Sequence, residues 1–298
     1  MIWFVLYTVI LLFVYRDAAN IQCMSALRQW FETMIPALFP MMLMSSVLVD
    51  TGFARKIGFL FSKTIFRPLP ISPNACYCLL TGFLCGFPMG AKTVSDMYGK
   101  GHMSRLEALW LLSFVNCIGP LYTIHVTHTL FPDIALWKLI AGLYLLPLLY
   151  GMLVLVLQTK LKKQTFKQIS SETTFSNLSI IDALYESVHK SGKSILILGG
   201  FMVLFQTFFL PLGKLLESIS ITSSNLYPLV EITGGLFLQP SNTSLPLILF
   251  WNTWGGACCM MQTYSFIKPV GLSMKTYVFH KTVLALISYL FGFILHQI

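Results

Sequence analysis

Long apolar stretches alternate with short polar connections along almost the whole chain. Six stretches approach or exceed the roughly 20 residues that a membrane-crossing helix needs. These predicted spans are residues 34–52, 106–131, 134–158, 194–212, 244–267 and 277–297. Residues 1–15 are apolar but short, with no basic residues before them and no small-residue cleavage site after them, which favours an uncleaved first helix over a signal peptide. The pattern therefore predicts about seven transmembrane helices.

Two further apolar pieces are too short or too interrupted to cross the bilayer simply. The first, residues 74–98, contains the helix breakers Gly82, Gly86, Pro88 and Gly90. The second, residues 226–240, contains Glu231, Gly234 and Gly235. Non-helical backbone at membrane depth is tolerated only where it is buried in protein or lines a wet cavity. Both pieces are therefore predicted to be re-entrant hairpins.

The composition excludes a soluble fold. Of the 298 residues, 56% are hydrophobic and only 10% are charged, and the mean hydropathy is +0.74. Soluble domains carry roughly a quarter charged residues. The net charge of +9 does not indicate nucleic-acid binding, because the basic residues lie between apolar spans and form no patch with exposed aromatics. We predict an all-α integral membrane protein.

The basic residues are unevenly distributed between the connections. Segments 54–72, 91–105, 159–193 and 268–281 hold 16 of the 20 Lys and Arg. Cytoplasmic loops carry an excess of these residues, so the four segments are assigned to the cytoplasm. Both interrupted pieces then return to the side from which they entered. The N-terminus is cytoplasmic if residues 1–15 span the membrane.

Matched landmarks in the two halves predict an internal repeat. Leu80-Thr81-Gly82 corresponds to Ile232-Thr233-Gly234, and the pattern F-x-N-x-x-G occurs at 114–119 and again at 250–255. The predicted domains are an N-terminal helix (1–24), a first gate-like repeat (25–158, with hairpin 74–98, broken helix 106–131 and span 134–158), a cytoplasmic linker (159–180) and a second gate-like repeat (181–298, with hairpin 226–240, broken helix 244–267 and final span 277–297). Three crossings per repeat would invert the second repeat relative to the first, as in many secondary transporters.

Asn116 and Asn252 are the strongest candidates for chemistry, because each places an amide one turn before a predicted helix break. An amide both donates and accepts hydrogen bonds. It could bind a solute, bond the opposite hairpin tip, or cap the carbonyls that its own broken helix leaves free. The sequence leaves these roles open.

Glu231 is the only acidic residue in the second predicted hairpin. A carboxylate inside a membrane is costly and by default suggests a proton or cation site, unless it lies close enough to the interface to be wetted. Further candidate binding groups are Thr81, Thr233, Thr253 and Gln262. The backbone of the turns and breaks is assigned to Gly82, Gly86, Pro88, Gly90, Gly119, Pro120, Gly234, Gly235, Gly255 and Gly256.

Motifs of soluble enzymes do not occur in the sequence. It contains no P-loop, no G-x-S-x-G and no H-E-x-x-H run. The seven Cys lack the spacing and companion His of a zinc site. We expect no catalytic activity, no cofactor and no metal.

Two runs carry a resemblance to a known family: GFLCGFPMGAK at 82–92 and LSFVNCIGP at 112–120. Over most of residues 25–295 the chain resembles the sporulation integral membrane proteins of the YlbJ type, and the run 251–256 with Gln262 resembles that family's second, glycine-rich gate segment. The family is similar to the nucleoside recognition, or Gate, domain of concentrative nucleoside transporters, ferrous-iron transporters and spore maturation proteins. The resemblance implies the cell membrane of a Gram-positive spore former and a role in sporulation, but it does not identify a solute.

The sequence thus predicts a transporter-like membrane protein for a small polar solute. The alternative is a structural membrane protein of the spore envelope that carries no flux. The candidate partners are the lipid bilayer, a small polar solute, a coupling cation and a second copy of the chain, with no nucleic acid.

Overall fold

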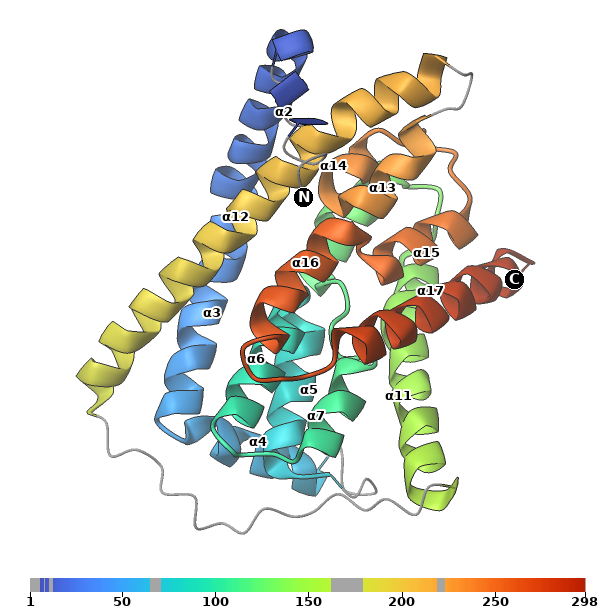
Figure 1. The fold of residues 1–298 in the computed structure, drawn as a ribbon. Helices are drawn as coiled ribbons and strands as arrows, with labels where there is room; N and C mark the ends of the chain where they lie inside the picture. The colour runs from blue at the N-terminus through green and yellow to red at the C-terminus, as the bar shows by residue number, and fades with distance from the viewer. Residues whose placement is uncertain are drawn as a thin grey trace.

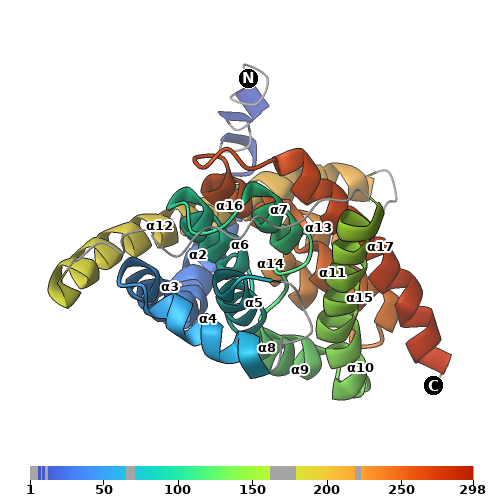
Figure 2. The same cartoon turned by 90° about the horizontal axis from the view of Figure 1, so that it is seen from below.

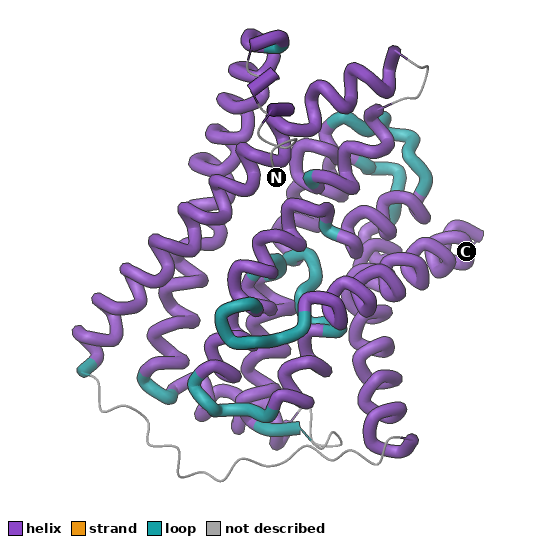
Figure 3. The backbone as a smooth tube through the Cα atoms, viewed as in Figure 1, coloured by secondary structure: helices purple, strands orange, loops and turns teal. Residues whose placement is uncertain are grey.

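The computed structural model describes residues 6–7, 9–10, 13–64, 71–161, 179–218 and 223–297. Across these ranges the chain consists of helices joined by loops, without a strand (Figure 3). The predicted all-α class is therefore confirmed for the described part. Most of the predicted linker at 159–180 and part of the predicted first helix at 1–24 lie outside the described residues.

One long helix runs from Arg16 to Asp50. Its consecutive segments are α2 (Arg16–Arg28), the π-helical turn η1 (Gln29–Met34) and α3 (Ile35–Asp50). The domain boundary predicted between residues 24 and 25 falls inside this helix, so the structure has no helix end there. Pro36 has no amide hydrogen to donate, and the wider π turn before it lets the helix continue.

The rest of the first half contains an amphipathic helix, a helical hairpin, a broken helix and a second long helix. These elements are α4 (Phe53–Thr64), α5 (Pro73–Cys85), α6 (Met89–Gly99), α7 (Arg105–Leu112), α8 (Pro120–Tyr122), η2 (Thr123–Thr127), α9 (His128–Leu130), α10 (Leu136–Ile140), η3 (Ala141–Leu145), α11 (Leu146–Val156) and η4 (Leu157–Leu161).

The second half follows a similar order. Its elements are α12 (Ile180–Ser218), η5 (Ser223–Leu226), α13 (Tyr227–Val230), α14 (Ile232–Phe237), α15 (Leu245–Trp254), α16 (Gly256–Ile267) and α17 (Met274–Gln297). Both halves therefore contain a long helix, a hairpin of shorter helices, a broken helix and a final long helix.

Four helices of the described residues are long and apolar enough to cross a membrane. They are Arg16–Asp50, Leu136–Thr159, Ile180–Phe209 and Met274–Gln297. The predicted spans 106–131 and 244–267 are not continuous helices. The first ends at Leu112 and resumes at Pro120, and the second is interrupted at Gly255.

Local residue types explain these interruptions. Gly255 and Gly256 both have positive φ, +80° and +77°, which L side chains rarely adopt and which a continuous helix excludes. Pro120 begins α8, where its missing amide hydrogen is harmless. Residues 113–119 are therefore non-helical between the end of α7 and Pro120, where a new helix begins.

The helices form two groups around the hairpins. α12 packs along α2 and α3, and α17 packs along α15. Seen from below, these two groups lie on opposite sides, with α5, α6 and α14 between them (Figure 2). This arrangement places both hairpins in the centre of the molecule.

α4, the start of α12 and the end of α11 lie at one end of the molecule (Figure 1). Here Asp50 at the end of α3 pairs with Lys100, and Lys190 of α12 lies 3.6 Å away from it. These segments belong to the stretches assigned to the cytoplasm. They come together at one end, and their assignment to the cytoplasm stays a prediction.

Candidate functional site

The turn of the α5–α6 hairpin packs on the break between α7 and α8. A Cβ at Gly86 would lie 2.2 Å from the amide nitrogen of Gly119. A Cβ at Gly82 would lie 2.5 Å from the Val115 carbonyl oxygen, and one at Gly90 would lie 2.7 Å from the same oxygen. Only glycine allows the two backbones to approach this closely. The first hairpin and the first break are thus in direct backbone contact.

The turn of the α13–α14 hairpin packs on the second break in a comparable way. A Cβ at Gly256 would lie 3.1 Å from the carbonyl oxygens of Pro228 and Val230. A Cβ at Gly255 would lie 2.8 Å from the ring of Phe87, which belongs to the turn of the first hairpin. Both hairpin turns and both helix breaks therefore meet in one region.

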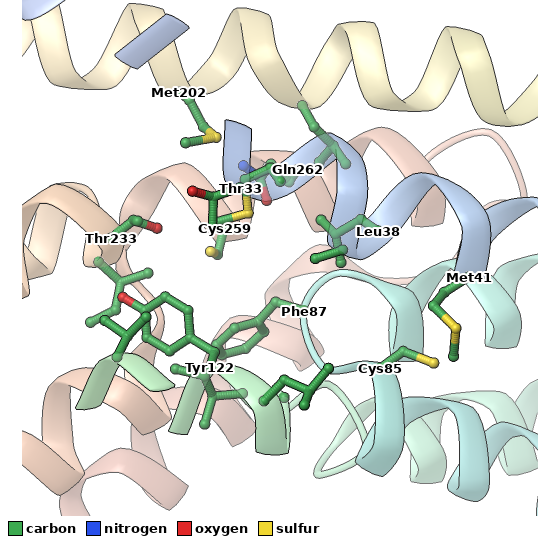
Figure 4. Close-up of a pocket in the computed structure, with 18 of the residues that line it drawn as sticks. Thr33, Leu38, Met41, Cys85, Phe87, Tyr122, Met202, Thr233, Cys259 and Gln262 are labelled. Atoms are coloured by element: carbon green, nitrogen blue, oxygen red, sulfur yellow. The ribbon is translucent and has the colours of Figure 1, made fainter. Parts of the chain in front are cut away.

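A cavity of about 300 Å³ lies in this region, between the hairpin turns and the long helices α3 and α12 (Figure 4). Its buried lining residues are Leu38, Ile118, Leu198, Met202, Glu231, Ile232, Thr233, Cys259 and Gln262. Exposed lining residues mark its mouth: Thr33, Ala37, Met41, Leu84, Leu121 and His125. The buried lining and the mouth are both largely apolar, with few polar side chains.

Glu231 is held by three donors. Its Oε1 accepts from the Thr233 amide at 2.9 Å, and its Oε2 accepts from the Gly234 amide at 2.7 Å and from Gln206 Nε2 at 2.9 Å. Gln206 Nε2 also donates to Gln29 Oε1 at 2.8 Å, which connects α12 to the π turn η1. The side chain is 2% exposed, so the prediction of a carboxylate in an apolar setting matches its burial.

The Tyr122 hydroxyl is the polar group of the lining that the described residues leave unsatisfied. The oxygen is buried and makes no hydrogen bond of ordinary geometry among them, although the Thr233 side chain lies close enough to interact with it. Its ring lies in the lower left of the close-up, with the hydroxyl on the side of Thr233 (Figure 4). Buried hydroxyls nearly always have a partner, so this group is available to a ligand.

The two predicted asparagines lie beside the cavity rather than in its lining. Asn116 Nδ2 donates to Thr263 Oγ1 and to the Tyr277 hydroxyl, both at 2.9 Å, and its Oδ1 accepts from the Ala91 amide at 3.3 Å. Its amide therefore bonds the first break to the second half of the chain. Binding of a solute by this residue stays a prediction.

Asn252 bonds both its own helix and the first half of the chain. Its Nδ2 donates to the carbonyl oxygen of Ile248 in its own helix at 2.8 Å, and its Oδ1 accepts from Thr127 Oγ1 of the first half at 3.2 Å. It is fully buried. Like Asn116, it links the two halves.

Of the other predicted side chains, two line the cavity and two do not. Thr233 and Gln262 line the cavity. Thr81 donates to the carbonyls of Tyr77 and Cys78 within its own helix, and Thr253 donates to Ser288 Oγ. The cavity thus gathers Glu231, Thr233, Gln262 and the backbone of Gly119, without Thr81 or Thr253.

Two details of the predicted second hairpin need correction. The chain turns at Glu231, whereas Gly234 and Gly235 lie inside α14, where a Cβ at Gly235 would lie 2.5 Å from Pro228. The matched triplets 80–82 and 232–234 lie on opposite arms of their hairpins, before the turn in α5 and after it in α14. Short apolar triplets recur by composition in such a chain, so this landmark was misleading.

Sequence reasoning missed Lys281 and the long-helix side of the cavity. Lys281 was counted among the cytoplasmic residues, but it is 4% exposed and its Nζ donates to the Asn116 carbonyl oxygen at 2.6 Å. A lone lysine inside the predicted span 277–297 was the available signal. For Leu38 and Met202 no signal existed, because an apolar residue looks the same toward lipid and toward a cavity.

Comparisons with known proteins agree with the resemblance. Residues 31–130 match the Gate family, described as nucleoside recognition. The sporulation integral membrane protein YlbJ of Bacillus subtilis (strain 168) is 27% identical over 249 residues, which cover 75% of this chain and 58% of YlbJ. The chain therefore spans less than two thirds of that relative's length. No solved structure matches it. The chain is thus an integral membrane protein similar to YlbJ, with a nucleoside-recognition-like Gate region at residues 31–130.

Proposed function

We propose that this chain is a transporter-like membrane protein without catalytic activity, in which two gate-like repeats of opposite orientation hold a small solute between their hairpin turns. The cavity of about 300 Å³ at the meeting point of both turns carries the proposal. Broken segments that enter from opposite faces can open a site between them alternately. The name of the relative YlbJ supports a role in sporulation.

The order of elements supports the repeat. Each half begins with a long helix, Arg16–Asp50 or Ile180–Phe209, and ends with another, Leu136–Thr159 or Met274–Gln297. A hairpin and a broken helix lie between them. In Figure 1 the α5–α6 hairpin lies in the lower half of the molecule and the α13–α14 hairpin in the upper half. Hairpins that enter from opposite ends are what an inverted repeat requires.

The lining favours a solute with an apolar body and one hydrogen-bonding edge. Apolar and sulfur-containing side chains form most of the cavity surface. The Tyr122 hydroxyl, Thr233 and Gln262 supply the polar groups. An unsatisfied buried hydroxyl costs about 1–3 kcal/mol, which a partner on the solute would recover. The solute proposed here is therefore less polar than the sequence alone suggested.

Ligand binding by cavity variants tests the proposal. A thermal-shift screen of the purified protein against small metabolites, nucleosides included, should yield a stabilising compound. Leu38→Trp fills the cavity and should abolish the shift, and Tyr122→Phe should weaken binding about tenfold through the lost hydrogen bond. Leu286→Trp, at a 51% exposed position of α17, is the control and should retain the shift. An undiminished shift in Leu38→Trp would place the ligand elsewhere.

Glu231 is the proposed coupling site for a proton or cation. In reconstituted vesicles, Glu231→Gln should abolish accumulation of the solute driven by a pH gradient, because the amide cannot take up and release a proton. Glu107→Gln is the matched control, because Glu107 is an equally buried carboxylate in the first half of the chain. It accepts a hydrogen bond from the Ser72 amide and does not line the cavity. Equal accumulation by wild type and Glu231→Gln would eliminate this role.

The dense glycine contacts favour a second candidate, a structural membrane protein of the spore envelope. The contacts of Gly82, Gly86 and Gly90 with residues 115–119 leave no space between the first hairpin and the first break. If this candidate holds, no compound stabilises the protein and vesicles show no flux. A ligand lost in Leu38→Trp excludes it.

A further inference from the structure

The buried lysine of α17 is the charged group that the preceding sections leave without a role. Lys281 lies about 10 Å along the helix from its first residue, inside a segment able to span the membrane. The other buried lysine of the described residues, Lys92, pairs with Asp96 at 2.7 Å. Lys281 has no ion pair with any described residue. An ammonium group in that position requires other compensation.

Two groups of the first half provide this compensation. The Asn116 carbonyl oxygen accepts from Lys281 Nζ at 2.6 Å, and the ring of Phe87 lies with its centroid 4.2 Å from the same atom. The carbonyl is available because α7 ends at Leu112 and residues 116–119 are not helical. An aromatic face attracts a cation, and so does a free carbonyl at a helix break.

Lys281 of the second half contacts two residues of the first half. Phe87 belongs to the first hairpin turn and Asn116 to the first break, whereas Lys281 comes from the last helix of the chain. Phe87 also packs against Gly255 of the second break. The ammonium therefore lies where the mobile parts of an alternating-access protein would have to separate.

We propose that Asn116 and Phe87 form a monovalent-cation site that the Lys281 ammonium fills permanently, as a tethered cation in place of a free one. The site would bind a primary alkylammonium ion if the lysine side chain were removed, because one carbonyl oxygen and an aromatic face match an N–H donor and supply no oxygen shell for a metal ion. Its consequence for transport, that the first break needs no free cation, rests on the proposed function, but the cation site itself does not.

Chemical rescue tests the site without knowledge of the solute. Lys281→Ala removes a segment equivalent to n-propylammonium, and the melting temperature should fall. At pH 7, with the ionic strength held constant by NaCl, n-propylammonium should raise it again in a saturable manner, by RT ln(1 + [L]/Kd). The wild type and Lys281→Met, which fills the space without charge, should not respond. Lys190→Ala, on the surface of α12, controls for unspecific salt effects.

Several outcomes would overturn the proposal. One is a folded Lys281→Ala protein that n-propylammonium does not stabilise; another is equal rescue by n-propanol, which has the shape but no charge. If Lys281→Ala does not fold, a double-mutant cycle between Lys281→Met and Phe87→Leu decides. Coupling supports a cation held on the ring, and strict additivity refutes it. If the thermal-shift screen finds no stabilising compound, the proposed function is refuted, but the results of the rescue experiment are unaffected.

Discussion

At the level of single residues, charged side chains form hydrogen bonds with backbone groups at the hairpin turn and the helix break. Glu231 accepts from the first free amides of α14, and Lys281 donates to the Asn116 carbonyl in the break between α7 and α8. In a membrane each unsatisfied backbone group costs several kcal/mol. Both charges therefore stabilise irregular backbone, in addition to any part they take in transport.

Removal of the Glu231 carboxylate should destabilise the protein. Glu231→Ala leaves the amides of Thr233 and Gly234 without an acceptor and should lower the free energy of unfolding by about 2 kcal/mol, whereas Glu231→Gln keeps one acceptor oxygen and should lose about half as much. Unfolding in a detergent titration measures both. Glu186→Ala, on the exposed face of α12, should change it by less than about 0.5 kcal/mol. A stable Glu231→Ala protein would contradict the capping role.

At the level of elements, the first hairpin depends on glycine for its contact with the first break. Both interruptions carry local signals that a helix cannot continue: Gly86 and Pro88 in the hairpin turn, and Gly119 and Pro120 at the end of the break. The sequence could not show that the two interruptions pack on each other. That contact depends on the path of the chain between them.

Gly86→Ala should disrupt this hairpin. The backbone has φ of +77° at this position, and the new Cβ would lie 2.2 Å from the Gly119 nitrogen. We expect a loss of about 3 kcal/mol or more, or no folded protein. Gly200→Ala is the control, because a Cβ there meets nothing within 4 Å inside α12, and it should be neutral or stabilise by up to about 1 kcal/mol. Equal yield and melting temperature of the two variants would refute the packing argument.

At the level of the whole molecule, hydrogen bonds between the halves hold the centre together. Asn116 bonds Thr263 and Tyr277, and Asn252 bonds Thr127, across 125 to 161 residues of sequence. These polar links are buried in an apolar interior, where they fix which surfaces of the two halves face each other.

A double-mutant cycle between Asn116→Ala and Tyr277→Phe should reveal this coupling. Each change removes the same 2.9 Å hydrogen bond. The double variant should therefore lose about 1 kcal/mol less unfolding free energy than the sum of the losses in the two single variants. Asn116→Ala combined with Ser62→Ala, on the exposed face of α4, should be additive. An additive Asn116–Tyr277 pair would show that the contact contributes nothing to the assembly of the halves.

Sequence alone predicts the membrane class, the uneven distribution of basic residues and the places where glycine and proline interrupt a helix. These properties depend on hydropathy, charge and the backbone chemistry of glycine and proline, which act over a few residues. The tertiary structure decided that Arg16–Asp50 is one helix, that the second hairpin turns at Glu231, and that Lys281 is buried against Asn116. It also decided which apolar residues line a cavity rather than face lipid. Each of these depends on neighbours contributed by distant segments, and the sequence of a single segment carries no record of them.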